Sequence, residues 1–176
     1  MTRPTARAAL ALVLLAAIRP MPGAAQGPVS EPALAARIAR LEAREDIRRL
    51  MIEYGRTLDR GDYAAYSRLF AADGEWVGSF GTFKGPAAIA AAVGKAMSAP
   101  AFAALNVGAF HLMTNAIIDI DGDHATAVSK WTFVRMVDHK PTLTYAGRYH
   151  DQFVVERGTW RFQRRVTLAA TDPDPP

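Results

Sequence analysis

The chain has 176 residues, of which half are hydrophobic, with 21 basic and 17 acidic side chains and no cysteine. The lack of cysteine excludes structural disulfides, a cysteine nucleophile and a lipid-modified N-terminal cysteine. The sequence has no phosphate-loop or dinucleotide-binding glycine motif, no basic stripe suited to nucleic acid, and no metal-ligand spacing among its four histidines.

The first 25 residues have the layout of a secretory signal peptide. Arg3 and Arg7 form a basic start, residues 8–18 are an apolar run, and small residues follow up to Ala25. The apolar run is shorter than the roughly 20 residues that a membrane span needs. We therefore expect a cleaved leader and a periplasmic or secreted protein that is not membrane-bound after cleavage, with an uncleaved amphipathic anchor as the alternative.

Cleavage after residue 25 would leave 151 residues, enough for one domain with a sizeable core. It would remove three basic and no acidic residues, so the mature chain would carry 18 basic and 17 acidic side chains and a net charge of +1. We expect a linker at residues 26–32, one folded domain at 33–170 and a polar tail at 171–176.

The first half of this domain has helical periodicity. A long helix is expected from about residue 33, because apolar side chains recur with the spacing of one helix face at Ile47, Leu50, Met51, Tyr54 and Leu58. Asp62 is placed to cap a second helix. Residues 72–74 are predicted to form a turn before a strand at 75–80, and a third, alanine-rich helix is expected to open at Pro86.

From residue 108 the period changes to two, which indicates strands. Strands are expected at 108–122, 125–137, 143–155 and 159–168, joined by short turns. In the first of them, strict alternation places His111 and Ile117 on one face and Ile118 on the other. Helices followed by a strand meander indicate an α+β domain, with the helices packed on one face of an antiparallel sheet.

His111 lies between apolar neighbours on the first of these strands. An imidazole that is buried without a hydrogen-bonding partner is costly, so a partner is expected. We predict that this partner is Asp59, far upstream near the end of the first helix.

Several short motifs resemble those of a known family. The run REDIRRLMIEYGRTLDRGDYAAYSRLFAADGEW is followed by GTFKG, HLMTN, DGDHATA, GRYHDQF and GTWRFQRR. Together, over residues 41–166, they resemble the SnoaL-like branch of the nuclear-transport-factor-2-like superfamily. The resemblance implies a cone-shaped α+β fold, in which N-terminal helices pack on a curved, mostly antiparallel sheet that encloses a pocket. It also implies a homodimer formed through the outer sheet face.

The resemblance implies four candidate site residues as well. In the dehydratase-like members a histidine on a strand pairs with an aspartate near the end of the first helix, and these positions fall on His111 and Asp59. A tyrosine of the bile-acid dehydratase corresponds to Tyr54, and a basic residue on the last strand corresponds to Arg165. The further carboxylate of that enzyme and the second histidine of scytalone dehydratase have no clear counterpart here.

This set of residues suits proton abstraction next to a carbonyl group. Asp59 would fix the tautomer of His111 and stabilise its imidazolium, which leaves the other ring nitrogen free as general base. Tyr54 can donate to a leaving hydroxyl or a carbonyl, and Arg165 can stabilise an enolate-like oxygen. The expected function is a dehydratase-like lyase or isomerase that acts on a hydrophobic carbonyl compound without a metal or organic cofactor.

Each of these residues also has a structural alternative. Asp59 can satisfy a helix end, and His111 and Tyr54 can belong to the core. Neighbouring strand residues face opposite sides, so either Arg165 or Arg164 would face the pocket, and the other would lie on the solvated face of the strand. For the whole protein, the alternatives are an exported binding protein that holds an apolar ligand in the same cone without chemistry, and a dimerising accessory subunit of a larger enzyme.

Overall fold

The computed structural model describes residues 30–100, 102–103 and 108–174. The expected signal peptide lies outside the described residues. The helices are α1 (Glu31–Asp59), α2 (Tyr63–Ser67) and α3 (Pro86–Ser98). The strands are β1 (Phe70–Gly78), β2 (Gly81–Lys84), β3 (Phe110–Asp121), β4 (His124–Val137), β5 (Lys140–Glu156) and β6 (Thr159–Ala169).

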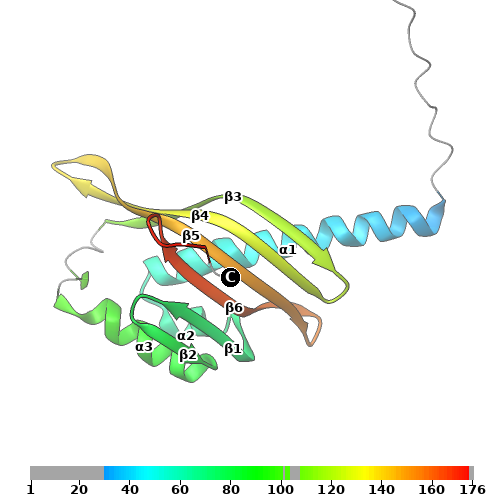
Figure 1. Ribbon diagram of the computed structural model, residues 1–176, viewed down its shortest axis with the longest axis horizontal. Coiled ribbons are helices and arrows are strands. Elements are labelled where there is room, and N and C mark those ends of the chain that lie inside the picture. Colours follow the sequence, from blue (N-terminus) through cyan, green and yellow to red (C-terminus); the bar gives the residue numbers. More distant parts are fainter. Residues whose placement is uncertain (1–29, 101, 104–107, 175–176) are drawn as a thin grey trace, which may run out of the picture.

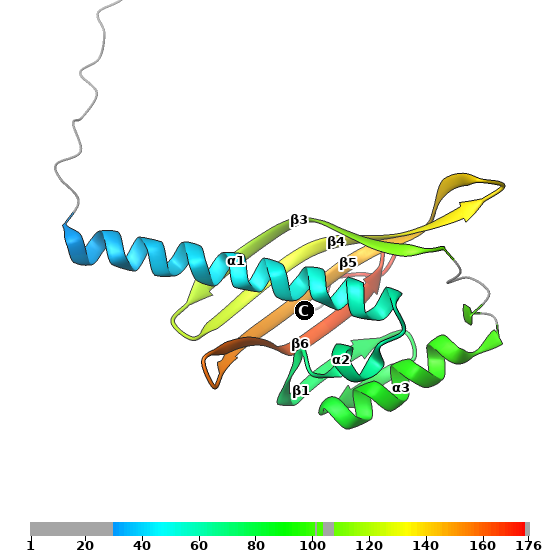
Figure 2. The same cartoon turned by 180° about the vertical axis from the view of Figure 1, so that it is seen from behind.

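The six strands form one curved sheet that does not close into a barrel, in the order β2-β1-β6-β5-β4-β3. All neighbouring pairs are antiparallel except β1 and β6, which run parallel. Helix α1 crosses one face of the sheet, and α2 and α3 pack together beside its β1–β2 end (Figures 1 and 2). The α+β class and the mostly antiparallel sheet are therefore confirmed.

Helix α1 carries the apolar stripe that its sequence predicts. Ile47, Met51 and Tyr54 are all buried, because residues with this spacing share the side of the helix that faces the sheet. The N-terminal end of α1 projects beyond the sheet (Figures 1 and 2), and Leu34 and Leu41 in this part of the helix stay exposed. No helix among the described residues has an apolar stretch long enough to cross a membrane.

A short turn at residues 60–62 ends the long helix α1 and leads into α2. Asp62 is the N-cap of α2, and its Oδ1 accepts a hydrogen bond of 2.8 Å from the backbone N–H of Ala65. This cap satisfies a donor that the helix start leaves free, as the sequence predicts. Gly61 before it has a φ of +70°, a conformation that glycine adopts without steric cost.

The prediction that a turn at residues 72–74 precedes the first strand is wrong, because these residues lie inside β1. The pairing of β1 with β6 slips between Phe70 and Glu75, so the irregularity lies within the strand. Gly74 is needed at this point, since a Cβ there would lie 2.7 Å from the carbonyl oxygen of Phe162.

Strict alternation along β3 is also wrong. The register of β3 with β4 slips around Asn115, whose φ of +55° is one that asparagine tolerates better than most residues. One extra residue in a strand exchanges the faces of everything after it. Ile118, only 5% exposed, therefore joins His111 on the side facing α1, while Ile117 is 70% exposed.

Strands β4, β5 and β6 are tied together by Trp131, whose ring lies close over Gly147. Its Nε1 donates a hydrogen bond of 3.2 Å to the carbonyl oxygen of Leu168. A Cβ at Gly147 would lie 2.0 Å from this oxygen and 2.6 Å from the indole ring. Neither contact is possible without a shift of backbone or ring.

We therefore expect Gly147→Ala to lower the free energy of unfolding by about 1–3 kcal/mol, the usual cost of overpacking, as measured by urea denaturation. Gly94→Ala in α3 is the control, because its Cβ would meet nothing closer than 3.3 Å and helix propensity favours alanine. Equal stability of Gly147→Ala and the wild type would contradict the close packing described for Trp131.

Candidate functional site

Asp59 and His111 meet although they are 52 residues apart in the sequence. Asp59 is the last residue of α1, and His111 is the second residue of β3, along which α1 packs. Nδ1 of His111 lies 2.6 Å from Oδ1 of Asp59. The backbone N–H of His111 donates to the same carboxylate, 3.0 Å from Oδ2. Both contacts fix the carboxylate and the imidazole ring relative to each other.

The surroundings of this pair are partly shielded from water. The side chains of His111 and Asp59 are 15% and 20% exposed, and the His111 ring lies 4.8 Å from the ring of Phe133. A carboxylate at Nδ1 assigns the proton of the neutral ring to that nitrogen, which leaves Nε2 as an acceptor. The pair thus has the arrangement of a histidine base oriented by a carboxylate, at a partly exposed position.

Tyr54 lies elsewhere, in the aromatic core. It is only 2% exposed, and its hydroxyl accepts a hydrogen bond of 3.1 Å from Nε1 of Trp76. Its ring centroid lies 4.7 Å from that of Tyr66 and 5.6 Å from that of Tyr149. Burial raises the pKa of Tyr66 and of Tyr149, and the neighbouring Tyr54 adds to both rises, so these phenols are neutral at physiological pH.

Arg165 is fully buried in the same core and is paired with Asp151. Asp151 stands directly opposite it in the β5–β6 register and accepts two hydrogen bonds, each of 2.7 Å, from Nε and Nη2. The guanidinium carbon lies 3.9 Å, 4.0 Å and 4.2 Å from the ring centroids of Tyr54, Tyr149 and Phe162. Arg165 is therefore enclosed by one carboxylate and three aromatic faces.

The electrostatics of the Asp151–Arg165 pair follow from its burial. Burial raises the pKa of Asp151, and the guanidinium of Arg165 opposes that rise. Burial lowers the pKa of Arg165, but the charge and hydrogen bonds of Asp151, together with Tyr54 and Tyr149, outweigh this effect, so the pKa of Arg165 ends above its usual value. Two parallel short hydrogen bonds are the geometry of an ionised pair. Nη1 of Arg165 is left without a hydrogen-bond partner among the described residues.

The structure thus divides the four candidate residues into two pairs. Tyr54 and Asp59 are five residues apart on α1, which places their side chains about 140° apart around the helix axis. Tyr54 consequently faces Arg165 on β6, whereas Asp59 faces His111 on β3. Within the part of the chain that the structure describes, no hydrogen bond or ion pair joins the two pairs.

Two points about the last strand are settled by these contacts. Arg165 faces the core, while Arg164 faces away and lies with its Nε 3.6 Å from Oε2 of Glu75. Sequence reasoning missed Asp151 as the partner of Arg165. The available signal was that a charged side chain is almost never fully buried unless it is paired, so an inward arginine requires an acid on a neighbouring strand.

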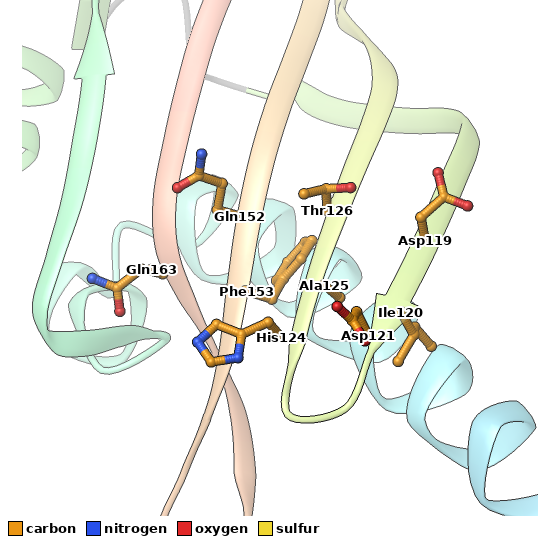
Figure 3. Close-up of a pocket in the computed structure, with 9 residues that line it drawn as sticks. All are labelled: Asp119, Ile120, Asp121, His124, Ala125, Thr126, Gln152, Phe153 and Gln163. Carbon is orange, nitrogen blue, oxygen red and sulfur yellow. The ribbon is translucent and has the colours of Figure 1, made fainter. Parts of the chain in front are cut away.

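The part of the chain that the structure describes includes two open surface hollows. One of about 360 Å³ lies beside the β3–β4 turn, and Figure 3 shows that Asp119, Gln152 and Gln163 line it from three strands and do not converge on a common point. The other, of about 390 Å³, lies between α1 and β3. Neither hollow is lined by Asp59, His111, Tyr54 or Arg165. The pocket expected beside the Asp59–His111 pair therefore stays a prediction.

The described residues contain no group of three or more histidine, aspartate or glutamate side chains that could hold a metal ion.

Comparison with known proteins gives a family and several structural neighbours. The family model described as SnoaL-like domain matches residues 39–166. An NTF2-like protein with a cystatin-like fold from Novosphingobium aromaticivorans is 33% identical, with a TM-score of 0.73 over 84% of this chain and 94% of that chain. A protein of unknown function with a cystatin-like fold from Nostoc punctiforme is 27% identical, with a TM-score of 0.62 over 76% and 93% of the two chains.

A third neighbour, a candidate scytalone dehydratase from Novosphingobium aromaticivorans, is 22% identical, with a TM-score of 0.59 over 73% of this chain and 84% of that chain. At this identity the likeness shows the fold alone. The curated proteins give no match.

Proposed function

Because the chain belongs to the family of SnoaL-like domains, we propose that it is a cofactor-independent lyase or isomerase of the dehydratase type. Its substrate would be a hydrophobic carbonyl compound. The observation that carries this proposal is the 2.6 Å contact between Asp59 Oδ1 and His111 Nδ1 at a partly exposed position. A candidate scytalone dehydratase has the same fold, so dehydration is a reaction that this fold can accommodate.

The chemistry follows from the orientation of the imidazole. Nε2 of His111 would take the proton from the carbon next to the carbonyl group, and the charge of Asp59 would stabilise the imidazolium that forms. In an elimination, the C–O bond to a β-hydroxyl then breaks, and His111 returns the proton to the leaving oxygen, which departs as water. In an isomerisation, the proton returns to a different carbon instead.

Tyr54 and Arg165 have another role in this scheme. Arg165 is fully buried, so a substrate beside His111 does not touch it unless the aromatic rings around it move. We assign both residues as positioning residues, which hold the last turns of α1 against the sheet and thereby set the place of Asp59. Arg165 contributes through its contact with the ring of Tyr54, five residues before that carboxylate.

The test is turnover of a panel of aromatic and polycyclic β-hydroxy ketones without added metal or cofactor. Formation of a conjugated enone is followed by its absorbance, and loss of water by mass spectrometry. We expect multiple turnovers on at least one member of the panel. A panel without any turnover, combined with an apolar ligand retained in native mass spectrometry, would contradict the catalytic proposal.

That second outcome would support ligand binding without chemistry. The observation that favours this alternative is the separation of Tyr54 and Arg165 from His111, which leaves the base without the two expected electrophilic partners.

In either case we propose export through cleavage near Ala25, which N-terminal sequencing of the protein from its host would test. We also propose a homodimer through the outer sheet face, where Ile117 and its register partner Val128 are exposed, and light scattering measures its mass.

A further inference from the structure

Strand β3 is an edge strand, and arginines of α1 cover part of its free backbone edge. Nη2 of Arg40 donates to the carbonyl oxygen of Ile120 at 3.0 Å, and Nη2 of Arg44 donates to that of Ile118 at 3.4 Å. Residues four apart lie on one side of a helix, and residues two apart in a strand present their carbonyls to the same edge. The next arginine in this series is Arg48.

Arg48 does not continue the pattern. It makes no hydrogen bond or ion pair with any residue that the structure describes. The reason lies in β3, because the irregularity around Asn115 interrupts the regular row of edge carbonyls just before Ile118. Arg48 instead lines the open hollow of about 390 Å³ between α1 and β3.

The remaining lining of this hollow is mostly apolar. Its other residues are Met51, Ile52, Met113, Thr114, Asn115 and Ala116, and none of them is acidic. Methionine side chains adapt to irregular apolar ligands, and Ile52 is 56% exposed, so apolar surface is open to solvent here. One unpaired cation, an amide and a hydroxyl thus adjoin an apolar surface.

We propose that this hollow binds amphipathic organic anions, in which a carboxylate is attached to a hydrocarbon or aromatic body. The carboxylate would pair with the guanidinium of Arg48, a geometry that arginine favours, with Asn115 as an additional donor. The hydrocarbon body would lie mainly on Ile52 and Met113, with the nearly buried Met51 at the wall of the hollow. None of these lining residues belongs to the Asp59–His111 pair, so the proposal does not require the proposed catalytic function.

The test uses 2-naphthoate and its neutral analogue 2-naphthamide as probes, with NMR of the methionine methyl groups as readout. We expect 2-naphthoate to shift the methyl signals of Met51 and Met113, and the amide to bind about 3–10-fold more weakly. Arg48→Gln should weaken naphthoate binding by a similar factor, as expected for a partly exposed charge pair. Arg49→Gln is the matched control, because Arg49 is exposed and does not line the hollow.

His111→Ala should bind 2-naphthoate as the wild type does, which separates this site from the proposed catalytic one. Equal affinities of Arg48→Gln and Arg49→Gln would overturn the proposal. So would naphthoate-induced shifts that leave the Met51 and Met113 methyl signals in place, or tighter binding of the amide than of the acid.

Discussion

Replacing His111 by alanine is expected to lower kcat/KM by about 10²–10⁴-fold on any substrate that the protein dehydrates or isomerises, the usual contribution of a positioned general base. The imidazole is the group that Asp59 orients, and its Nε2 is free to accept a proton. Steady-state kinetics on the best substrate of the panel measures the effect, with circular dichroism to establish that the variant is folded.

The chain offers a closely matched control for this variant. His124 has the same contact with an aspartate, 2.6 Å from its Nδ1 to Oδ1 of Asp123, but both side chains are 69% exposed. His124→Ala should therefore keep the wild-type rate. Asp59→Asn should lose activity as well, since an amide neither stabilises the imidazolium nor holds the correct tautomer. Wild-type rates in His111→Ala would contradict the general-base role.

Asp151→Ala is expected to lower the free energy of unfolding by about 3–5 kcal/mol, because it leaves the guanidinium of Arg165 buried without its counter-charge. Both side chains of this pair are fully buried, so water does not replace the lost carboxylate unless the core opens. Urea denaturation measures the effect, and the double variant Asp151→Ala/Arg165→Met should recover much of the loss, since it removes the unpaired charge.

The control is the partly exposed ion pair on the opposite face, between Arg164 and Glu75. Glu75→Ala should change the free energy of unfolding by less than about 1 kcal/mol, as is usual for a surface pair. If Asp151→Ala were as mild as Glu75→Ala, or if adding Arg165→Met gave no recovery, the description of a buried and mutually dependent pair would be wrong.

The three helices and the four strands after residue 108 were predictable because they depend on local periodicity and on single residues such as Asp62. The short strand β2 was not predicted. The contact of Asp59 with His111 was predictable from the cost of a histidine among apolar neighbours, together with the family resemblance. The reversal of the two faces of β3 after Asn115 was not predictable. It depends on the left-handed conformation of Asn115, which nothing in the alternating pattern indicates.

The separation of the site residues could be predicted in part. The angle of about 140° between residues five apart on a helix already implies that Tyr54 and Asp59 face different strands. The burial of Arg165 could not be predicted, because it depends on the β5–β6 register that sets Asp151 directly opposite. Such pairing between strands is a property of the folded sheet and not of either segment alone.

The most direct measurement of proton abstraction by His111 is exchange of the α-proton of a bound ketone with deuterated water, followed by NMR. It records removal of the proton even when no elimination follows. We predict exchange at least about 100-fold faster with the wild type than with His111→Ala. Equal exchange in the two proteins, at the rate of buffer alone, would contradict a working Asp59–His111 base.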